Sequence, residues 1–480
     1  ESYGLETGYG FASYFSRLNY KWHNRYLLGA SVRYDGSSRF GAENRYGVFP
    51  AVSAGWIVSE ADFLKQVSKL NFLKIRASYG FTGNAAIGDF EYLGFYITGG
   101  SYNGASAIVP STLANPSLKW ERSTQLDINL DYGFFNDRIA GSITYYNKQT
   151  KDLLLNVSVP TSSGYDGVYQ NVGSLQNVGW EFALNTQNLV GAFKWSTQFN
   201  SAFNRNKVLD IAGLPPDALE GGEPGEGRVI PNYPVGVSYV VPFAGVQEQD
   251  GELPVFDLEG NAVLDDNGNQ EMMFVSGGTE LFYDKNDNLM AFGNGKHPGS
   301  FYGDHRRPWG SPVPIVIGGL TNNIAFKGFD LSALLSFQYG NSIYDDDAKN
   351  QIGQYQNQAQ RYEVLDAWTP TNINTDVPKL DGYVSVNSTR FLYDGSYMRL
   401  KSLSLGYSLP QKITHKLKTN AVRLYLNGTN LFTLTQYPGW DPEVLRDTAT
   451  NTQQANVSFS GPYRPTPQAK TITAGISVQF

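Results

Sequence analysis

The chain has 480 residues, a formal net charge of -7 at pH 7 and no cysteine. The lack of cysteine excludes a disulfide framework, a cysteine-ligated zinc site and a thiol nucleophile. The modest charge, without a basic stripe that carries interleaved aromatic residues, argues against a nucleic-acid partner.

The composition favours a β-rich protein. The 31 Tyr, 28 Phe and 51 Gly residues are typical of strands joined by turns. No stretch approaches the roughly 18 consecutive apolar residues of a membrane helix, and the most apolar run, residues 313–320, is far shorter. A membrane protein with this sequence would therefore have to be a β-barrel, because a barrel crosses lipid without a long apolar segment.

Apolar and polar residues alternate with a period of two along the predicted strands, and three segments show this clearly. In chain order, their apolar faces carry Leu73, Ile75, Ala77, Tyr79 and Phe81, then Trp120, Thr124, Leu126, Ile128, Leu130 and Tyr132, and finally Ile472, Ala474, Ile476, Val478 and Phe480. The intervening residues are mostly polar. Strands of roughly 9 to 15 residues exceed ordinary globular strands and suit a tilted membrane strand of about 9 to 11 residues.

Short and long connections alternate along most of the chain. Short links are predicted at residues 23–25, 134–138, 190–192 and 327–328, with small helical or irregular caps at residues 59–70 and 410–420. Long polar stretches are predicted at residues 83–115, 210–233, 260–311, 341–395 and 438–466. Outer-membrane barrels have this asymmetry, with short turns in the periplasm and long loops outside.

These connections predict about 15 strands. Because bacterial single-chain barrels have an even number of strands, we expect further strands from sequence outside residues 1–480. A soluble β-sandwich or propeller would also alternate, but it would bury its apolar face in a core.

No catalytic motif is present: the sequence has no G-x-S-x-G elbow, P-loop or H-E-x-x-H pair. We therefore expect no enzyme. Residues 265–269 and 284–288 resemble pieces of a calcium loop, but neither completes the twelve-residue pattern with its glycine and terminal glutamate. We interpret both as hairpin turns, with calcium held by outer-loop carboxylates as the alternative, and we expect no other cofactor.

Two groups of residues are candidates for contact with a ligand. In a long loop, Arg306 and Arg307 lie beside Trp309, where guanidinium groups and an indole could stack on and hydrogen-bond a sugar or a peptide. The alternative is that these residues anchor the loop to the rim. On the predicted polar face, charged side chains could line a passage or hold something that fills it, and these are Arg33, Arg76, Glu121 and Asp127.

Several motifs resemble the SusC/RagA family of TonB-dependent transporters. In chain order, the motifs occupy residues 34–41, 44–50, 53–56, 118–121, 134–138, 177–182, 430–432 and 441–443. Each motif alone is weak, but the ordered set covers almost the whole chain from about residue 15 onward. The chain also ends on an alternating strand with Phe480, which is similar to the terminal signal that directs outer-membrane barrels to their assembly machinery.

The resemblance implies a 22-stranded antiparallel barrel that encloses an N-terminal plug. Residues 1–480 would form the C-terminal part of this barrel, and the plug and the first strands would come from sequence not present here. The implied protein lies in outer-membrane lipid, pairs with a SusD-like surface lipoprotein, and imports oligosaccharides or oligopeptides with energy delivered by TonB to the missing N-terminal part. The alternatives are a secreted β-rich carbohydrate-binding or hydrolytic module and a passive porin.

Overall fold

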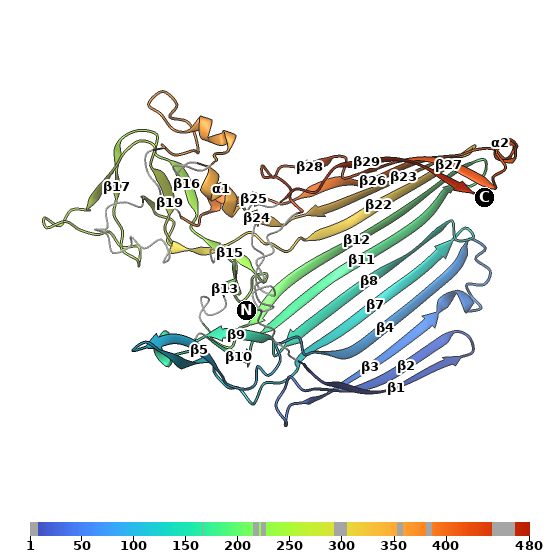
Figure 1. Cartoon of the computed structure of the whole chain (residues 1–480), viewed down its shortest axis with the longest axis horizontal. Coiled ribbons are helices and arrows are strands. Elements are labelled where there is room, and N and C mark those ends of the chain that lie inside the picture. The colour runs from blue at the N-terminus through green and yellow to red at the C-terminus, as the bar shows by residue number, and fades with distance from the viewer. Residues whose placement is uncertain are drawn as a thin grey trace.

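The computed structural model describes residues 8–165, 167–214, 220–221, 227–291, 305–352, 359–380, 386–443 and 466–480. Within these ranges, long antiparallel strands form one curved sheet, which we call the wall, and neighbouring strands follow the chain order (Figure 1). The wall consists of β1 (Phe11–Trp22), β2 (Tyr26–Ser37), β3 (Tyr46–Ile57), β4 (Leu70–Asn84), β7 (Glu121–Phe134), β8 (Ile139–Lys151), β11 (Ser174–Leu189), β12 (Phe193–Asp210), β22 (Val316–Phe326), β23 (Phe329–Tyr339), β26 (Tyr397–Ser408), β27 (Ala421–Thr429), β28 (Thr433–Thr435) and β29 (Thr471–Gln479).

The number of strands differs from the prediction. The described wall has 14 strands, but β27 and β28 both pair with β26 and act as one interrupted strand. The predicted loops at residues 210–233 and 260–311 belong to a single connection between β12 and β22. The segment between them forms strands of only 4 residues, which are far too short to cross a hydrocarbon layer of about 30 Å.

The short connections all lie at one end of the wall, on the right in Figure 1. The first uses left-handed backbone at His23 and Asn24, with φ of 47° and 56°. The two longer links contain the 3-10 helix η1 (Val58–Glu60) and the helix α2 (Gln411–Lys416), so the predicted small caps are confirmed. No helix in the described ranges is long and apolar enough to cross a membrane.

The long connections lie at the opposite end and carry their own small sheets (Figure 1). Their strands are β5 (Phe95–Tyr102), β6 (Ala105–Thr112), β9 (Leu154–Ser158), β10 (Gly167–Asn171), β13 (Glu220–Gly221), β14 (Gly227–Arg228), β15 (Val237–Val240), β16 (Phe243–Val246), β17 (Gly251–Pro254), β18 (Met272–Val275), β19 (Glu280–Tyr283), β20 (Leu289–Ala291), β21 (Arg307–Trp309), β24 (Ser342–Tyr344) and β25 (Leu392–Asp394). Their helices are η2 (Thr161–Ser163), α1 (Asp346–Gln351), η5 (Tyr362–Asp366) and η6 (Thr389–Phe391). Much of the predicted loop at residues 438–466 lies outside the described residues.

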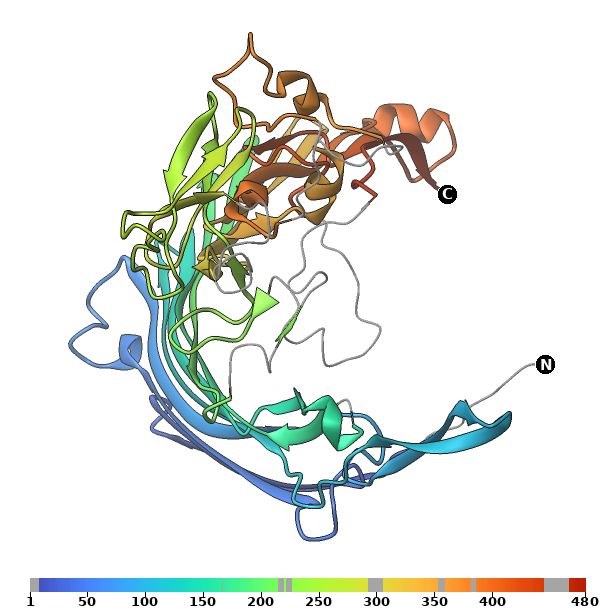
Figure 2. The ribbon, with the colours of Figure 1, turned by 90° about the vertical axis from the view of Figure 1, so that its left-hand side faces the viewer.

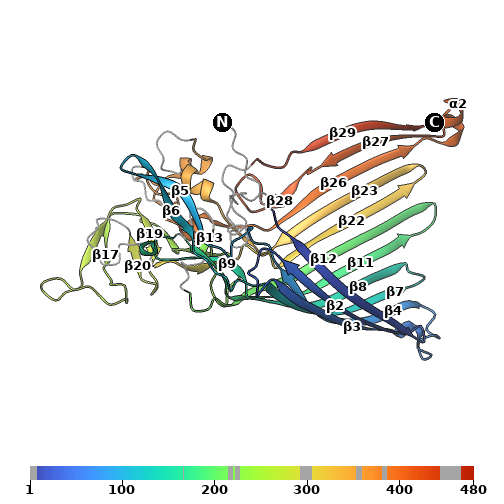
Figure 3. The same ribbon diagram turned by 60° about the horizontal axis from the view of Figure 1, so that its bottom comes forward.

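The apolar face of the wall is exposed. Ile75 is 43% exposed and Ile476 is 66% exposed, whereas a sandwich or propeller would bury both in a core. Seen from the loop end, the wall is an arc (Figure 2), and its strands run obliquely side by side (Figure 3). The four clusters of buried apolar residues involve the loops and the loop ends of strands. These observations exclude the soluble alternative and confirm the antiparallel barrel class.

We expect an introduced charge to destabilise the protein by different amounts on the two faces of β23. Leu335 pairs with Leu320 and Leu400 on the apolar face, whereas the adjacent Leu334 pairs with Thr321 and Ser402 on the polar face. Leu335→Lys should therefore cost about 2–4 kcal/mol of stability in lipid vesicles. Leu334→Lys should cost less than about 1 kcal/mol, since its ammonium group can reach water.

Reversible unfolding in vesicles, followed as a function of denaturant, measures both values. Equal losses in the two variants would contradict the assignment of the apolar face to lipid.

Candidate functional site: the concave face and the outer loops

The four charged residues predicted for the polar face all lie on it, but each is held by different neighbours. Arg33 pairs with Asp35 two residues away on the same strand. Arg76 donates from Nε to Asn129 Oδ1 at 2.9 Å and contacts Asp131 at 3.3 Å on the adjacent strand.

The two predicted acidic residues come from the same strand, β7. Asp127 accepts hydrogen bonds from Ser78 and Gln125 at 3.3 and 2.8 Å. Glu121 lies at the loop end of β7 and accepts hydrogen bonds from Asn84 and from the backbone of Leu154, both at 3.4 Å. Asp127 and Glu121 thus each bond to the neighbouring strand β4, and the role of all four residues in lining a passage stays a prediction.

Polar side chains are paired along much of the concave face. Ser123 and Thr150 hydroxyls lie 2.8 Å apart, and Asn129 donates to Thr144 at 2.6 Å. Ser404 donates to Asn427 at 2.7 Å. Hydroxyl and amide groups can both donate and accept, so this surface offers hydrogen bonds to neutral polar ligands.

The predicted loop group at residues 306–309 is partly an anchor. Arg307 in β21 pairs with Asp287 of a neighbouring hairpin, and its guanidinium lies 5.7 Å from the centroid of the Trp309 ring. Trp309 itself is 40% exposed, and Arg306 has contacts of its own. The Arg307 contacts agree with the anchoring interpretation, while Trp309 stays partly exposed; binding of a ligand here stays a prediction.

The two candidate calcium segments form hairpin turns. Asp265 Oδ1 accepts from the backbone of Asn267 and Asn269 at 2.9 and 2.8 Å, and the bond from Asn269 lowers the pKa of the Asp265 carboxyl. Asp284 Oδ1 accepts from Asn286 and Asn288, both at 2.8 Å. In the part of the chain that the structure describes, no group of three His, Cys, Asp or Glu residues could hold a metal ion. Calcium in the outer loops stays an untested alternative.

Three of the family-like motifs, residues 34–41, 44–50 and 118–121, meet in an aromatic cluster at the loop end of the wall. Trp120 packs against Phe40 and Phe49, with ring centroids 5.3 and 5.4 Å apart, and its indole donates to the Arg45 carbonyl at 3.1 Å. Phe40 is fully buried. The motif residues therefore tie the β2–β3 loop to the start of β7 and have a packing role.

Another motif, residues 441–443, fastens an outer loop to β26. Arg399 is 2% exposed and donates to the carboxylates of Asp441 and Glu443, and Lys401 also donates to Glu443, at 2.6 Å. Burial acts to raise the pKa of the Asp441 carboxyl, but hydrogen bonds from Arg399 and from the backbone of Glu443 hold it below its ordinary value. We call this group the β26 latch.

Buried charges also join two long loops to each other, and sequence reasoning missed them. Arg390 pairs with Glu280, from a loop 110 residues earlier, and both side chains are almost fully buried. Burial raises the pKa of the Glu280 carboxyl, against the opposing effect of Arg390. Asp345 caps α1 and accepts from Arg361 and Tyr437, both at 2.8 Å. No local pattern marks partners so distant in sequence.

Residues 2–431 match the model of the family described as "TonB dependent receptor-like, beta-barrel". The chain belongs to this family. It is 34% identical to TonB-dependent receptor P3 of Formosa agariphila over 98% of this chain and 45% of that protein. It is 32% identical to TonB-dependent receptor SusC of Bacteroides thetaiotaomicron over 98% of this chain and 43% of that protein.

A solved structure of the RagAB peptide transporter matches 98% of this chain and 48% of the compared chain, with a TM-score of 0.79 and 27% identity. The chain therefore resembles both SusC and RagAB, and it spans about half the length of the curated relatives it matches. The family places it in the outer membrane. Phe480, 88% exposed just beyond β29, stays a predicted assembly signal.

We expect Arg399→Gln to free the loop that follows β28. Loss of the guanidinium leaves Asp441 buried without its charged partner, which typically costs about 3–5 kcal/mol. Hydrogen exchange at residues 437–443 should rise accordingly, because it reports local opening.

Arg25→Gln is the matched control. Arg25 pairs with Asp62, whose side chain is 77% exposed, so its loss should cost less than about 1 kcal/mol. Unchanged exchange in Arg399→Gln would show that the latch does not hold the loop.

Proposed function

We propose that the chain forms part of the wall of an outer-membrane importer that takes up oligosaccharides or oligopeptides with energy supplied through TonB. The observation that carries the proposal is the division of one continuous sheet into an exposed apolar face and a concave polar face. Such a sheet is stable only with lipid on one side and water or polar groups on the other. Membership of the TonB-dependent receptor family supports the energy source.

The proposed partner on the outer side is a SusD-like surface lipoprotein. Its support is the likeness to the RagAB peptide transporter and to SusC. All the long connections lie at one end of the wall, where a surface protein would meet them (Figure 1). TonB would act through a plug in the part of the longer relatives that this chain does not match.

The polar groups near the loop end suit a neutral oligomer. Asn177 accepts from Asn204 and Asn206 at 3.3 and 2.9 Å, and Tyr146 donates to Asn204 at 3.0 Å. Amide groups can bind both sugar hydroxyls and peptide groups, because each amide both donates and accepts. This surface therefore favours polar oligomers over apolar ligands.

Uptake by cells that carry the full-length protein tests the proposal. Labelled oligosaccharides or oligopeptides should enter wild-type cells, and entry should stop when TonB is deleted or the proton gradient is collapsed. A passive porin would keep its flux under both treatments, and that result would overturn the proposal.

The substrate class should be visible in what co-purifies with the protein. We expect mass spectrometry of gently extracted protein to find oligosaccharides or oligopeptides, and the class found should be the one that cells accumulate. Competition by the unlabelled compound should reduce uptake of the labelled one, whereas a compound of the other class should not compete. Equal competition by both classes would contradict a selective importer.

A further inference from the structure

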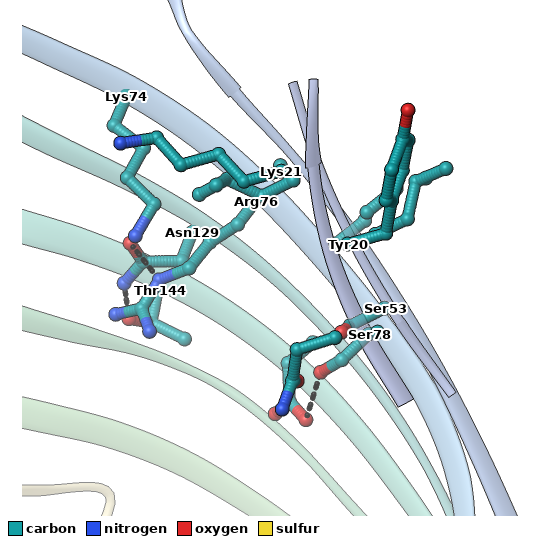
Figure 4. Close-up of a pocket in the computed structure, with 16 residues that line it drawn as sticks. Tyr20, Lys21, Ser53, Lys74, Arg76, Ser78, Asn129 and Thr144 are labelled. Atoms are coloured by element: carbon teal, nitrogen blue, oxygen red, sulfur yellow. Dashed lines mark hydrogen bonds between the residues drawn. The ribbon is translucent and has the colours of Figure 1, made fainter. Parts of the chain in front are cut away.

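A hollow of about 550 Å³ opens on the concave face, at the wall strands β1, β2, β3, β4, β7 and β8. It lies across one row of paired residues, in which Gly55 faces Leu27 on one side and Arg76 on the other. Figure 4 shows Lys21, Lys74 and Arg76 extending to the same side of the sheet, while Tyr20 points away from the opposite face.

Small residues make room for the hollow. Gly29 and Gly55 form its floor together with Ser53 and Ser78. At Gly29 a Cβ atom would lie 2.6 Å from Ser53 Oγ, so a larger residue would have to displace its neighbour. The backbone is therefore within reach of any group that enters, and the longer side chains stand around the edge.

The charge around this hollow is only partly balanced. Arg76 is bound to Asn129 and Asp131, and Asp127 is held by Ser78 and Gln125. For the side chains of Lys21 and Lys74 the structure gives no hydrogen bond or ion pair to any residue within the described ranges. Two ammonium groups thus face one space, while Asp131, which lies opposite Lys74 on the adjacent strand, contacts Arg76, and Asp127 accepts from Ser78 and Gln125. An anionic group that enters would gain charge-assisted hydrogen bonds from both.

We propose that this hollow is a carboxylate-binding site that takes the side chain of an aspartate or glutamate from a polypeptide lying inside the curve of the wall. Lys21 and Lys74 supply the charge. A polypeptide carries an acidic side chain on a short stem, and the glycine floor lets such a side chain approach the wall closely. The inference rests on the proposed function, because it takes the concave face as the inside of a barrel. The carboxylate could belong to another segment of the same protein or to a transported peptide.

Carbodiimide cross-linking of the purified full-length protein tests the site and separates the two sources. The reagent joins an amine to a carboxylate only where the two are in contact, without adding a spacer. We expect Lys21 or Lys74 to form an amide bond with an aspartate or glutamate outside residues 1–480. A bond to a co-purified peptide would support the same site with a transported ligand.

The Lys119–Asp152 pair is an internal standard, with its atoms 3.1 Å apart and both side chains partly exposed. The proposal is overturned if this pair cross-links while Lys21 and Lys74 do not. It is equally overturned if the two lysines join only to Asp127 or Asp131, because the wall would then balance its own charge.

A double variant, Lys21→Gln with Lys74→Gln, gives a second measurement. This variant cannot form cross-links from these two positions. The readout is therefore the hydrogen exchange of the segment that cross-links to Lys21 or Lys74 in the wild-type protein, and this exchange should become faster. The matched control is Lys416→Gln with Lys418→Gln, which changes the same charge near α2 and should leave that exchange unchanged.

Unchanged exchange in the Lys21 and Lys74 variant would count against the site. None of these measurements depends on uptake. If cells that carry the wild-type protein show no TonB-dependent uptake while the purified protein still forms the cross-link, the result counts against the transport proposal alone.

Discussion

Backbone hydrogen bonding determines the architecture of this chain. A peptide group that crosses hydrocarbon finds no partner in lipid, and each unsatisfied group costs several kcal/mol. In the wall the partner is always the adjacent strand, since every strand from β2 to β27 is paired on both sides. Strands of 9 to 18 residues maintain these ladders across the membrane. The ladders impose the two-residue period, and the role of each side chain follows from the face on which it lies.

The two faces use cross-strand pairs for different purposes. On the apolar face, neighbours such as Leu424 and Ile476 present a continuous surface to lipid. On the concave face, pairs such as Asn129 with Thr144 hydrogen-bond each other across neighbouring strands, and each group keeps further donor or acceptor positions for a ligand. The lysines beside Gly29 and Gly55 differ from this background because the surrounding wall does not neutralise them.

The faces and the short turns could be predicted from sequence because both depend on local chemistry. The turn at Phe135, Asn136 and Asp137 has φ between 57° and 59°, and Asn and Asp tolerate this conformation better than most residues. The number of wall strands is predicted less accurately than the faces and turns. The segment that contains β15, β16 and β17 counts toward the wall in that prediction, but each of these strands ends after 4 residues. The ion pairs of the loops were beyond reach for another reason: their partners are far apart in sequence.

Outside the lipid the backbone pairing of the wall no longer determines the conformation of the chain. The long loops are held there by small apolar clusters and buried ion pairs. A buried pair adds little net stability, because desolvation offsets the attraction, but it penalises every arrangement that separates the partners. The Arg390–Glu280 pair, together with the bridge between Val241 and Ser388, joins the loop after β12 to the loop after β23. A displacement of one of these loops therefore carries the other with it. The β26 latch fixes the loop after β28 to the wall itself, and the hydrogen bond from Tyr437 to Asp345 joins that loop to the loop after β23.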